Sequence, residues 1–270
     1  IFSVWLQSSN VGGAAQLACV VLGMIILLVS LEKLSRRKMQ FFNMSSQHCK
    51  MTKIKLKGFS NLLAFSCCFV PVLLGFALPL IVLAEHSMSN PKLFLDRALI
   101  DATWNTVFTG TIAATFTVVL SIFMVFGMKS IKGRLPKIIM PITTIGYAVP
   151  GAVLGVGILI PLAALDNGLA DVIYYITQID IGLIFTGTSF AIILAYIVRF
   201  FAIGQGATEA ALGRISPNLE HAARSLGKSR SSVLNRIHLP IIKGSLGSAM
   251  LLVFVDCVKE LPATLLLRPF

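Results

Sequence analysis

Residues 59–84 read FSNLLAFSCCFVPVLLGFALPLIVLA and contain no Asp, Glu, Lys or Arg. A helix needs about 20 apolar residues to cross the hydrocarbon layer of a bilayer, which is about 30 Å thick. This run is therefore long enough to cross a membrane. The whole 270-residue chain agrees, because 56% of its residues are hydrophobic and only 13% are charged. Soluble domains carry about 25% charged residues, so composition excludes a soluble enzyme, a disordered protein and a small disulfide scaffold.

Several further runs have the same character. The runs without a charged residue, including the one at 59–84, are Val11–Leu31, Phe59–Ala84, Trp104–Gly127, Ile138–Leu165 and Ile181–Val198. A sixth run, Gly244–Leu267, is apolar except for Asp256, Lys259 and Glu260. Inside a bilayer the backbone must satisfy its own hydrogen bonds as a helix or a closed barrel, and no run alternates as barrel strands do. The sequence therefore predicts an all-α, polytopic bundle of six transmembrane helices.

The net charge of +12 would suit nucleic acid if it formed one basic surface. Instead, eighteen of the 23 basic residues lie in three alternate loops, Glu32–Lys57, Met128–Lys137 and Gly204–Lys243. Lys and Arg are enriched in cytoplasmic loops, so these loops are predicted to be cytoplasmic and the chain to start and end outside. The bilayer, and no nucleic acid, is the expected partner of this charge pattern.

The loop Gly204–Lys243 is too polar to cross the membrane, and its pattern predicts a helix–Gly–helix element. The first helix is expected to start at Ser216 and Pro217 and to end at Gly227, with one apolar stripe at helical spacing: Leu219, Ala222, Ala223 and Leu226. Ser229 is expected to cap a second short helix, which Leu239 ends because Pro240 follows it. The alternative is an amphipathic loop lying on anionic lipid.

The spacing in this loop resembles the cytoplasmic EAA loop of ABC-importer permeases. In that family Glu-Ala-Ala is followed after three residues by Gly and, nine residues later, by Ile-x-Leu-Pro. The sequence has Glu220-His221-Ala222-Ala223, then Gly227, and then Ile237-His238-Leu239-Pro240 at those separations. It departs at one position, because His221 stands where the family has Glu and Glu220 comes one residue earlier.

The resemblance implies that this loop docks into a dimer of separate ATPase subunits. Its coupling residues would be Glu220, His221, Ala222, Ala223, Gly227, Ile237, Leu239 and Pro240. ATP and Mg would then be bound by the ATPase, and this chain would bind no cofactor and be no enzyme by itself. The residues agree: Gly227-Lys228-Ser229 lacks the earlier glycine of a phosphate-binding loop, and the five cysteines lack metal-site spacing.

The segments 146–161, 214–217 and 259–269 resemble the ferric-iron branch of these permeases. The resemblance implies a multi-pass protein of the bacterial inner membrane, fed by a periplasmic iron-binding protein. Related branches carry thiamine, polyamines or phosphonates. Such proteins fuse two halves, so residues 1–31 are expected to be the last helix of a preceding half and 32–57 a basic linker. Residues 58–270 would be the second half, truncated at its C-terminus, with the EAA-like loop at 204–243.

Two groups of residues are candidates for the translocation path. In Ile138–Leu165, three prolines predict a bent or broken helix, and Tyr147 and Pro150 lie at its centre. In the last run, Asp256, Lys259 and Glu260 are expected on one helix face, with Lys259 pairing with Asp256 and Glu260 left to meet a cation. The alternatives are helix packing for the first group and an interfacial ion pair for the second.

Two other functions fit the composition. An ion-gradient-driven secondary transporter would use the broken helix and the face with Asp256 and Glu260. A membrane scaffold would transport nothing. The EAA-like spacing favours the ATP-driven importer, because gradient-driven carriers have no use for a helix pair at that spacing.

Overall fold

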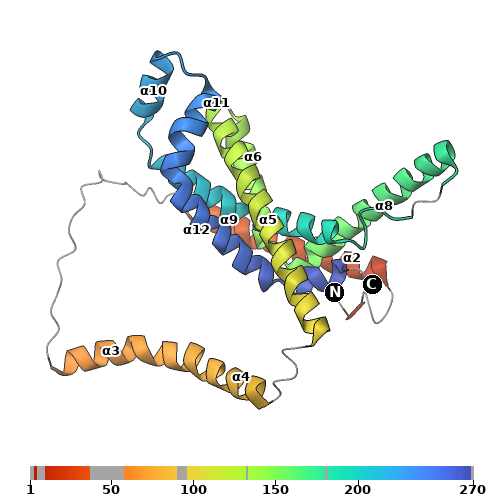
Figure 1. Ribbon diagram of the computed structural model, residues 1–270, viewed down its shortest axis with the longest axis horizontal. Coiled ribbons are helices and arrows are strands. Elements are labelled where there is room, and N and C mark those ends of the chain that lie inside the picture. Colours follow the sequence, from red (N-terminus) through yellow and green to blue (C-terminus); the bar gives the residue numbers. More distant parts are fainter. Residues whose placement is uncertain are drawn as a thin grey trace. The chain divides into compact units, whose positions relative to one another are not determined.

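The computed structural model describes residues 3–4, 10–36, 58–89, 96–131, 133–179 and 182–268 (Figure 1). All regular elements of these residues are helical. The chain forms two compact units, one of residues 1–35 and 105–270 and the other of residues 36–104, and each is described by itself. The part of the predicted linker at 37–57 lies outside the described residues.

The second unit holds the uncharged run Phe59–Ala84. Helix α3 (Phe59–Val72), a π-helical turn η1 (Leu73–Ala77) and helix α4 (Leu78–Ser89) follow one another without interruption. None of the side chains in the resulting span, Phe59–Ser89, is buried. A helix that is apolar on every side suits lipid, so the predicted crossing Phe59–Ala84 is confirmed as a helix long enough to span.

Five helices of the described residues are long and apolar enough to cross a membrane: Phe59–Ser89, Arg97–Lys129, Gly151–Thr177, Ser189–Gly213 and Arg230–Val258. The polytopic helical fold is therefore confirmed. The predicted first crossing, Val11–Leu31, lies in helix α2 (Val11–Arg36), whose apolar section Gly12–Leu28 is shorter than these five.

The run Ile138–Leu165 is broken, as its prolines predict. It contains α6 (Leu135–Thr143), α7 (Ile145–Ala148) and the start of α8 (Gly151–Thr177), with Val149 and Pro150 extended between α7 and α8. The apolar run ends at Leu165, whereas helix α8 continues to Thr177.

Asp166 explains why α8 continues past Leu165, where an outer loop was expected. Its side chain is fully buried and accepts hydrogen bonds from the backbone N–H groups of Ile184, Phe185 and Thr186, at 2.5–3.2 Å. The carboxylate thus satisfies the backbone of the segment that leads into the next helix, α9 (Ser189–Gly213). Because its charge is held by these donors, Asp166 is accommodated inside the helix.

The predicted last crossing, Gly244–Leu267, is wrong at both ends. Helix α11 (Arg230–Val233), a π-helical turn η3 (Leu234–His238) and α12 (Leu239–Val258) form one continuous helix, and a short α13 (Pro262–Leu267) follows a break. The expectation that Leu239 ends a helix is also wrong. Leu239 donates its N–H to the carbonyl of Leu234, five residues back, and this wider turn accommodates Pro240 within the helix.

The core of the first unit is built around α9, which packs against α6, α7, α8, α12 and α13. Small residues bring α5 (Arg97–Ser130) against the same core: Ala113 and Ala114 of α5 and Ala191 and Ala195 of α9 are all fully buried in one cluster. Further along, Gly204 lies against Thr117 and Ser121 of α5, and the hydroxyls of Ser121 and Thr208 are 3.0 Å apart. Small residues and hydroxyl pairs of this kind hold helices together within a membrane.

Candidate functional site

The helix–Gly–helix element forms as predicted at Ser216, Gly227 and Ser229. Ser216 caps α10 (Pro217–Ser225) by accepting the N–H of Asn218 at 3.4 Å. Gly227 follows in the left-handed conformation, with φ of 75°. Ser229 then caps α11 by accepting the N–H of Ser232 at 3.3 Å. The element therefore has a fixed geometry of its own, set by two hydroxyl caps and one glycine.

The apolar stripe of α10 is split between two environments. Ala223 is buried, whereas Ala222 is exposed and the side chains of Leu219 and Leu226 are 47% and 80% exposed. His221 is also exposed, and Glu220 is half-buried. Ala223 thus packs against the rest of the unit, whereas Leu226 is almost wholly exposed and Leu219 is about half exposed.

The second helix of the element was predicted to be short, but it is the beginning of a membrane span. Ile237 and Leu239 are half-buried and Pro240 is exposed, all within the continuous helix Arg230–Val258. His238 is buried, with its ring edge-on to Phe126 of α5 at 5.7 Å between centroids. In Figure 1, α10 and α11 lie together at one end of α12. A force on α10 therefore acts close to the end of a single long helix.

Two of the other candidate residues, Pro150 and Glu260, belong to two helix interruptions that lie against each other at the far end of α12. The first is the extended pair Val149–Pro150 between α7 and α8, and the second is Lys259–Leu261 between α12 and α13. Helix α13 packs against α8. We refer to these two interruptions, with Gly151 and Arg199, as the junction.

Arg199 of α9 connects the two interruptions. Its Nη1 donates to the carbonyl oxygen of Val149 at 2.5 Å, and its Nε lies 3.0 Å from Oε2 of Glu260. Both side chains of the ion pair are largely removed from solvent, with 18% of Arg199 and 8% of Glu260 exposed. An isolated charge in a membrane helix costs about 2.5–3.5 kcal/mol on insertion scales, and mutual pairing reduces this cost.

Glu260 is held from several directions. Its Oε1 accepts the N–H of Ala263 at 3.3 Å in the first turn of α13, and a Cβ on Gly151 would overlap the same oxygen. Its backbone carbonyl accepts the hydroxyl of Thr264, whose Oγ1 is 2.6 Å from Oη of Tyr196. The expectation that Glu260 is a free carboxylate is therefore wrong, because Arg199 neutralises it.

Asp256 and Lys259 form a separate pair. Nζ of Lys259 is 2.6 Å from Oδ1 of Asp256, as predicted, whereas Glu260 pairs with Arg199. Helix α12 ends at Val258, so the regular spacing expected to place all three residues on one helix face stops before Lys259. The carboxylate of Asp256 raises the pKa of Lys259 above its ordinary value. Tyr147 is 53% exposed, and its ring lies 6.5 Å from that of Phe200. Of the four path candidates, the structure thus brings Pro150 and Glu260 into one cluster.

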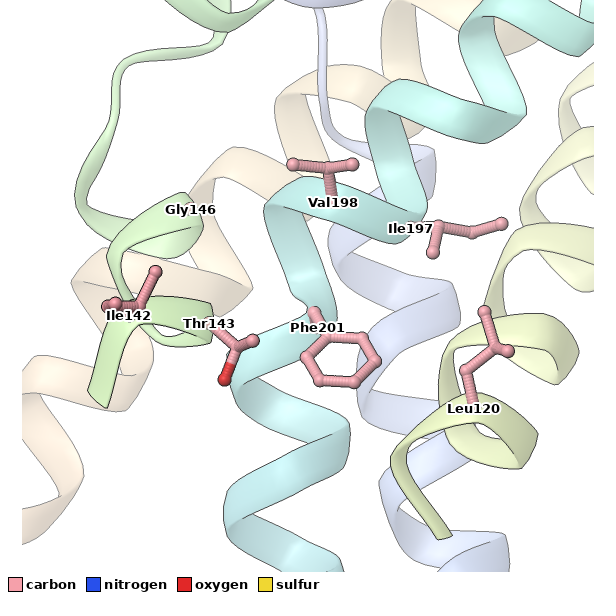
Figure 2. A pocket seen from close by; sticks show the side chains of 7 residues that line it. All are labelled: Leu120, Ile142, Thr143, Gly146, Ile197, Val198 and Phe201. Carbon is pink, nitrogen blue, oxygen red and sulfur yellow. The ribbon is translucent and has the colours of Figure 1, made fainter. Parts of the chain in front are cut away.

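A pocket of about 250 Å³ lies beside the junction and is lined by Leu120 of α5, Ile142 and Thr143 of α6, Gly146 of α7, and Ile197, Val198 and Phe201 of α9 (Figure 2). Its lining carries no charge, and the hydroxyl of Thr143 already donates to Oε1 of Gln205 at 2.6 Å. Ferric iron requires hard oxygen ligands, which this lining lacks. The pocket is therefore a poor site for a metal ion.

Arg199 was missed as a candidate because the search for uncharged runs stops at the first charge. The run Ile181–Val198 ends directly before it, although α9 continues to Gly213. The signal was present in the sequence: Arg199 follows one apolar run and precedes the apolar residues 200–203. An ionisable residue in such a position is a functional candidate by itself.

Residues 124–268, more than half of the chain, match the model of the family described as "Binding-protein-dependent transport system inner membrane component". This chain belongs to that family. Membership and the spanning helices make it a multi-pass inner-membrane protein and a component of a transport system. The matched residues include both α10 with its glycine and the whole junction.

Named relatives of this transport component include two ferric permeases. It is 25% identical over 273 residues to the Fe(3+)-transport system permease protein FbpB 2 of Haemophilus influenzae, covering 99% of this chain and 50% of that protein. It is 27% identical over 187 residues to the ferric transport system permease protein FbpB of Actinobacillus pleuropneumoniae, covering 67% and 25%. A probable molybdenum ABC transporter permease protein of Haloferax volcanii is 25% identical over 200 residues, covering 73% and 70%. The chain thus spans half or less of the two ferric relatives.

Proposed function

We propose that this chain is the permease part of an ATP-driven importer that carries ferric iron. The observation that carries the proposal is the helix–Gly–helix element. It has the EAA-like spacing, a fixed local geometry and an exposed apolar face, and it continues without interruption into a membrane span. Ferric permeases among the named relatives supply the choice of substrate.

In this mechanism the ATPase subunits bind ATP and Mg, and the ATPase is contacted by Leu219 and Ala222 of α10 and by Leu226, which directly follows the helix. Exposed apolar side chains gathered at one place are typical of a surface that binds another protein. Glu220, His221, Ala223, Gly227, Ile237, Leu239 and Pro240 shape the element that bears this surface. Movement of the ATPase then shifts the long helix Arg230–Val258 as a rigid body.

The substrate would be delivered by a periplasmic binding protein and pass the second permease half as well as this one. At the junction and the adjoining end of α12, both carboxylates are already paired, Glu260 with Arg199 and Asp256 with Lys259. A ferric ion would therefore meet no free carboxylate there and would make only brief contacts while passing. Weak contact suits transport, because a tightly held ion would not be released.

Binding of the ATPase tests the coupling part of the proposal. Leu226→Asp places a charge on the exposed face of α10 and should abolish co-purification of the ATPase subunit with the permease. Leu135→Asp is the matched control, because Leu135 is also exposed, at 51%, but lies at the start of α6. Equal ATPase recovery with both variants would contradict docking through α10.

Transport assays in proteoliposomes test the energy source and the substrate. Uptake of radioactive ferric iron, presented by its binding protein, should require ATP inside the vesicle and persist when ionophores collapse ion gradients. Uptake driven by a gradient without ATP would support the secondary transporter instead. Molybdate, thiamine, polyamine and phosphonate should fail to compete, and competition by one of them would reassign the substrate.

A further inference from the structure

Arg199 stands near the middle of α9, and its guanidinium contacts two other parts of the chain at once. One contact is to the carbonyl of Val149, directly before the break at Pro150. The other is to the carboxylate of Glu260, inside the break between α12 and α13. A planar guanidinium has five N–H donors in a fixed fork, so it can hold both partners in one geometry.

Each of the two breaks leaves backbone groups without partners inside its own helix. A helix end exposes backbone carbonyls on one side and N–H groups on the other. At the junction, Arg199 satisfies the carbonyl of Val149, while Glu260 satisfies the N–H of Ala263 in α13. The ion pair between Arg199 and Glu260 therefore joins the caps of two different breaks into one connected unit.

The ion pair between Arg199 and Glu260 is linked to both helices that flank α10. Helix α9 is continuous from Arg199 to Gly213, and only residues 214–216 separate it from α10. On the other side, the continuous helix Arg230–Val258 ends two residues before Glu260. Each of the two helices leading away from α10 thus reaches one member of the ion pair.

We propose that Arg199 is a positioning residue that couples movement of α10 to the two helix breaks, so that they shift together during substrate passage. The inference rests on the proposed function, because it takes α10 to be where the ATPase acts. When α9 and α12 move relative to each other, the ion pair transmits the movement to the Pro150 break and to α13. Without it, the breaks relax separately and ATP hydrolysis is no longer tied to transport.

The number of substrate ions transported per ATP hydrolysed distinguishes coupling from a purely structural role. Loss of folded protein lowers transport and hydrolysis in the same proportion and leaves this ratio unchanged. Loss of coupling lowers the ratio itself. The assay uses the permease reconstituted with its ATPase and binding protein, with radioactive ferric iron as the probe.

Two substitutions test the two contacts. Arg199→Gln removes the charge and should lower the ratio by roughly 2- to 30-fold, the range expected for residues that carry coupling between distant sites. Arg199→Lys keeps the positive charge near Glu260 but has no guanidinium fork to reach Val149 as well. The number of ions it transports per ATP hydrolysed should therefore lie between that of Arg199→Gln and that of wild type. Arg134→Gln is the control, because Arg134 is exposed at the start of α6.

An unchanged number of ions transported per ATP in both Arg199 variants would overturn the inference, even if transport and hydrolysis both fell in the same proportion. A wild-type protein without ATP-dependent uptake would instead overturn the proposed function. The two failures are distinguishable, because the first appears only in the variants and the second already in the unchanged protein.

Discussion

Oε1 of Glu260 occupies the place that a side-chain Cβ would take on Gly151. This contact joins the first residue of α8 to the break before α13, and it is possible only because position 151 has no side chain. Gly151 and Glu260 are more than a hundred residues apart in the chain. Their contact is what brings the two interrupted helices together beside Arg199.

Gly151→Ala should therefore displace the Glu260 carboxylate from Arg199 and Ala263. We expect a loss of stability of about 1–3 kcal/mol, the usual cost of inserting a methyl group into a packed site. Transport should fall together with it. Thermal unfolding in detergent and uptake in proteoliposomes measure the two effects.

Gly157→Ala is the control for Gly151→Ala. Both glycines belong to α8, but a Cβ on Gly157 would have no atom within 4 Å. Because alanine is a better helix former than glycine, this variant should be as stable as wild type or slightly more stable. Equal effects of the two substitutions would show that the contact with Glu260 is unimportant.

Gly227 offers a test at the helix–Gly–helix element, near the other end of the continuous helix Arg230–Val258. Its φ of 75° lies in the left-handed region, where a residue with a Cβ pays about 1–2 kcal/mol. Gly227→Ala should therefore tilt α10 away from its docking geometry and weaken ATPase binding by about 5- to 30-fold. Affinity measured by titrating the purified ATPase onto the permease checks this.

Gly213→Ala is the comparison for Gly227→Ala, because Gly213 ends α9 in helical geometry and a Cβ there would also meet nothing within 4 Å. Its ATPase affinity should match that of wild type. If Gly227→Ala binds as tightly as Gly213→Ala, the left-handed turn is dispensable for docking.

Asp166→Asn should destabilise the segment between α8 and α9. The carboxylate accepts N–H groups from three successive residues, and an amide would turn a donor toward them. We expect the melting temperature to fall by about 5 °C. Asp171→Asn, at an exposed position of the same helix, should leave it unchanged, and a similar fall in both would mean that the three bonds contribute little.

The apolar runs predicted the helical fold correctly, but they placed several helix ends wrongly. A run ends at the first charged residue, whereas a helix continues when that charge has a partner. Arg199 has Glu260, and Asp166 has three backbone donors from a segment 18–20 residues away. Such partners depend on tertiary structure, so local hydropathy could not reveal where α8 and α9 end.

The two ends of the helix–Gly–helix element also show how far local sequence rules predict helix ends. Ser216, Gly227 and Ser229 act within a few residues of themselves, so their roles were predictable. Pro240 was expected to end a helix, and the prediction failed because a π-helical turn at Leu234–His238 accommodates it. Leu239 is hydrogen-bonded to Leu234 five residues back, and a local rule that assigns a helix end before proline does not anticipate such a widened turn.

The ion pair Arg199–Glu260 of the junction and the neighbouring pair Asp256–Lys259 should differ sharply in their contribution to stability. Glu260→Gln removes the partner of a largely buried guanidinium, and breaking such a pair costs about 3–5 kcal/mol because a charge is left unpaired.

Asp256→Asn leaves Lys259, whose side chain is 69% exposed and reaches water by itself, so stability should change little. Thermal unfolding of both variants, measured under identical detergent conditions, checks that Glu260→Gln is less stable than Asp256→Asn. The pKa of Lys259 is raised in the folded protein, so any contribution of its pair is fully present at neutral pH and is lost only in alkali, above the ordinary lysine pKa. An Asp256→Asn variant less stable than Glu260→Gln at neutral pH would contradict the assignment of Arg199 and Glu260 as the pair that holds the junction together.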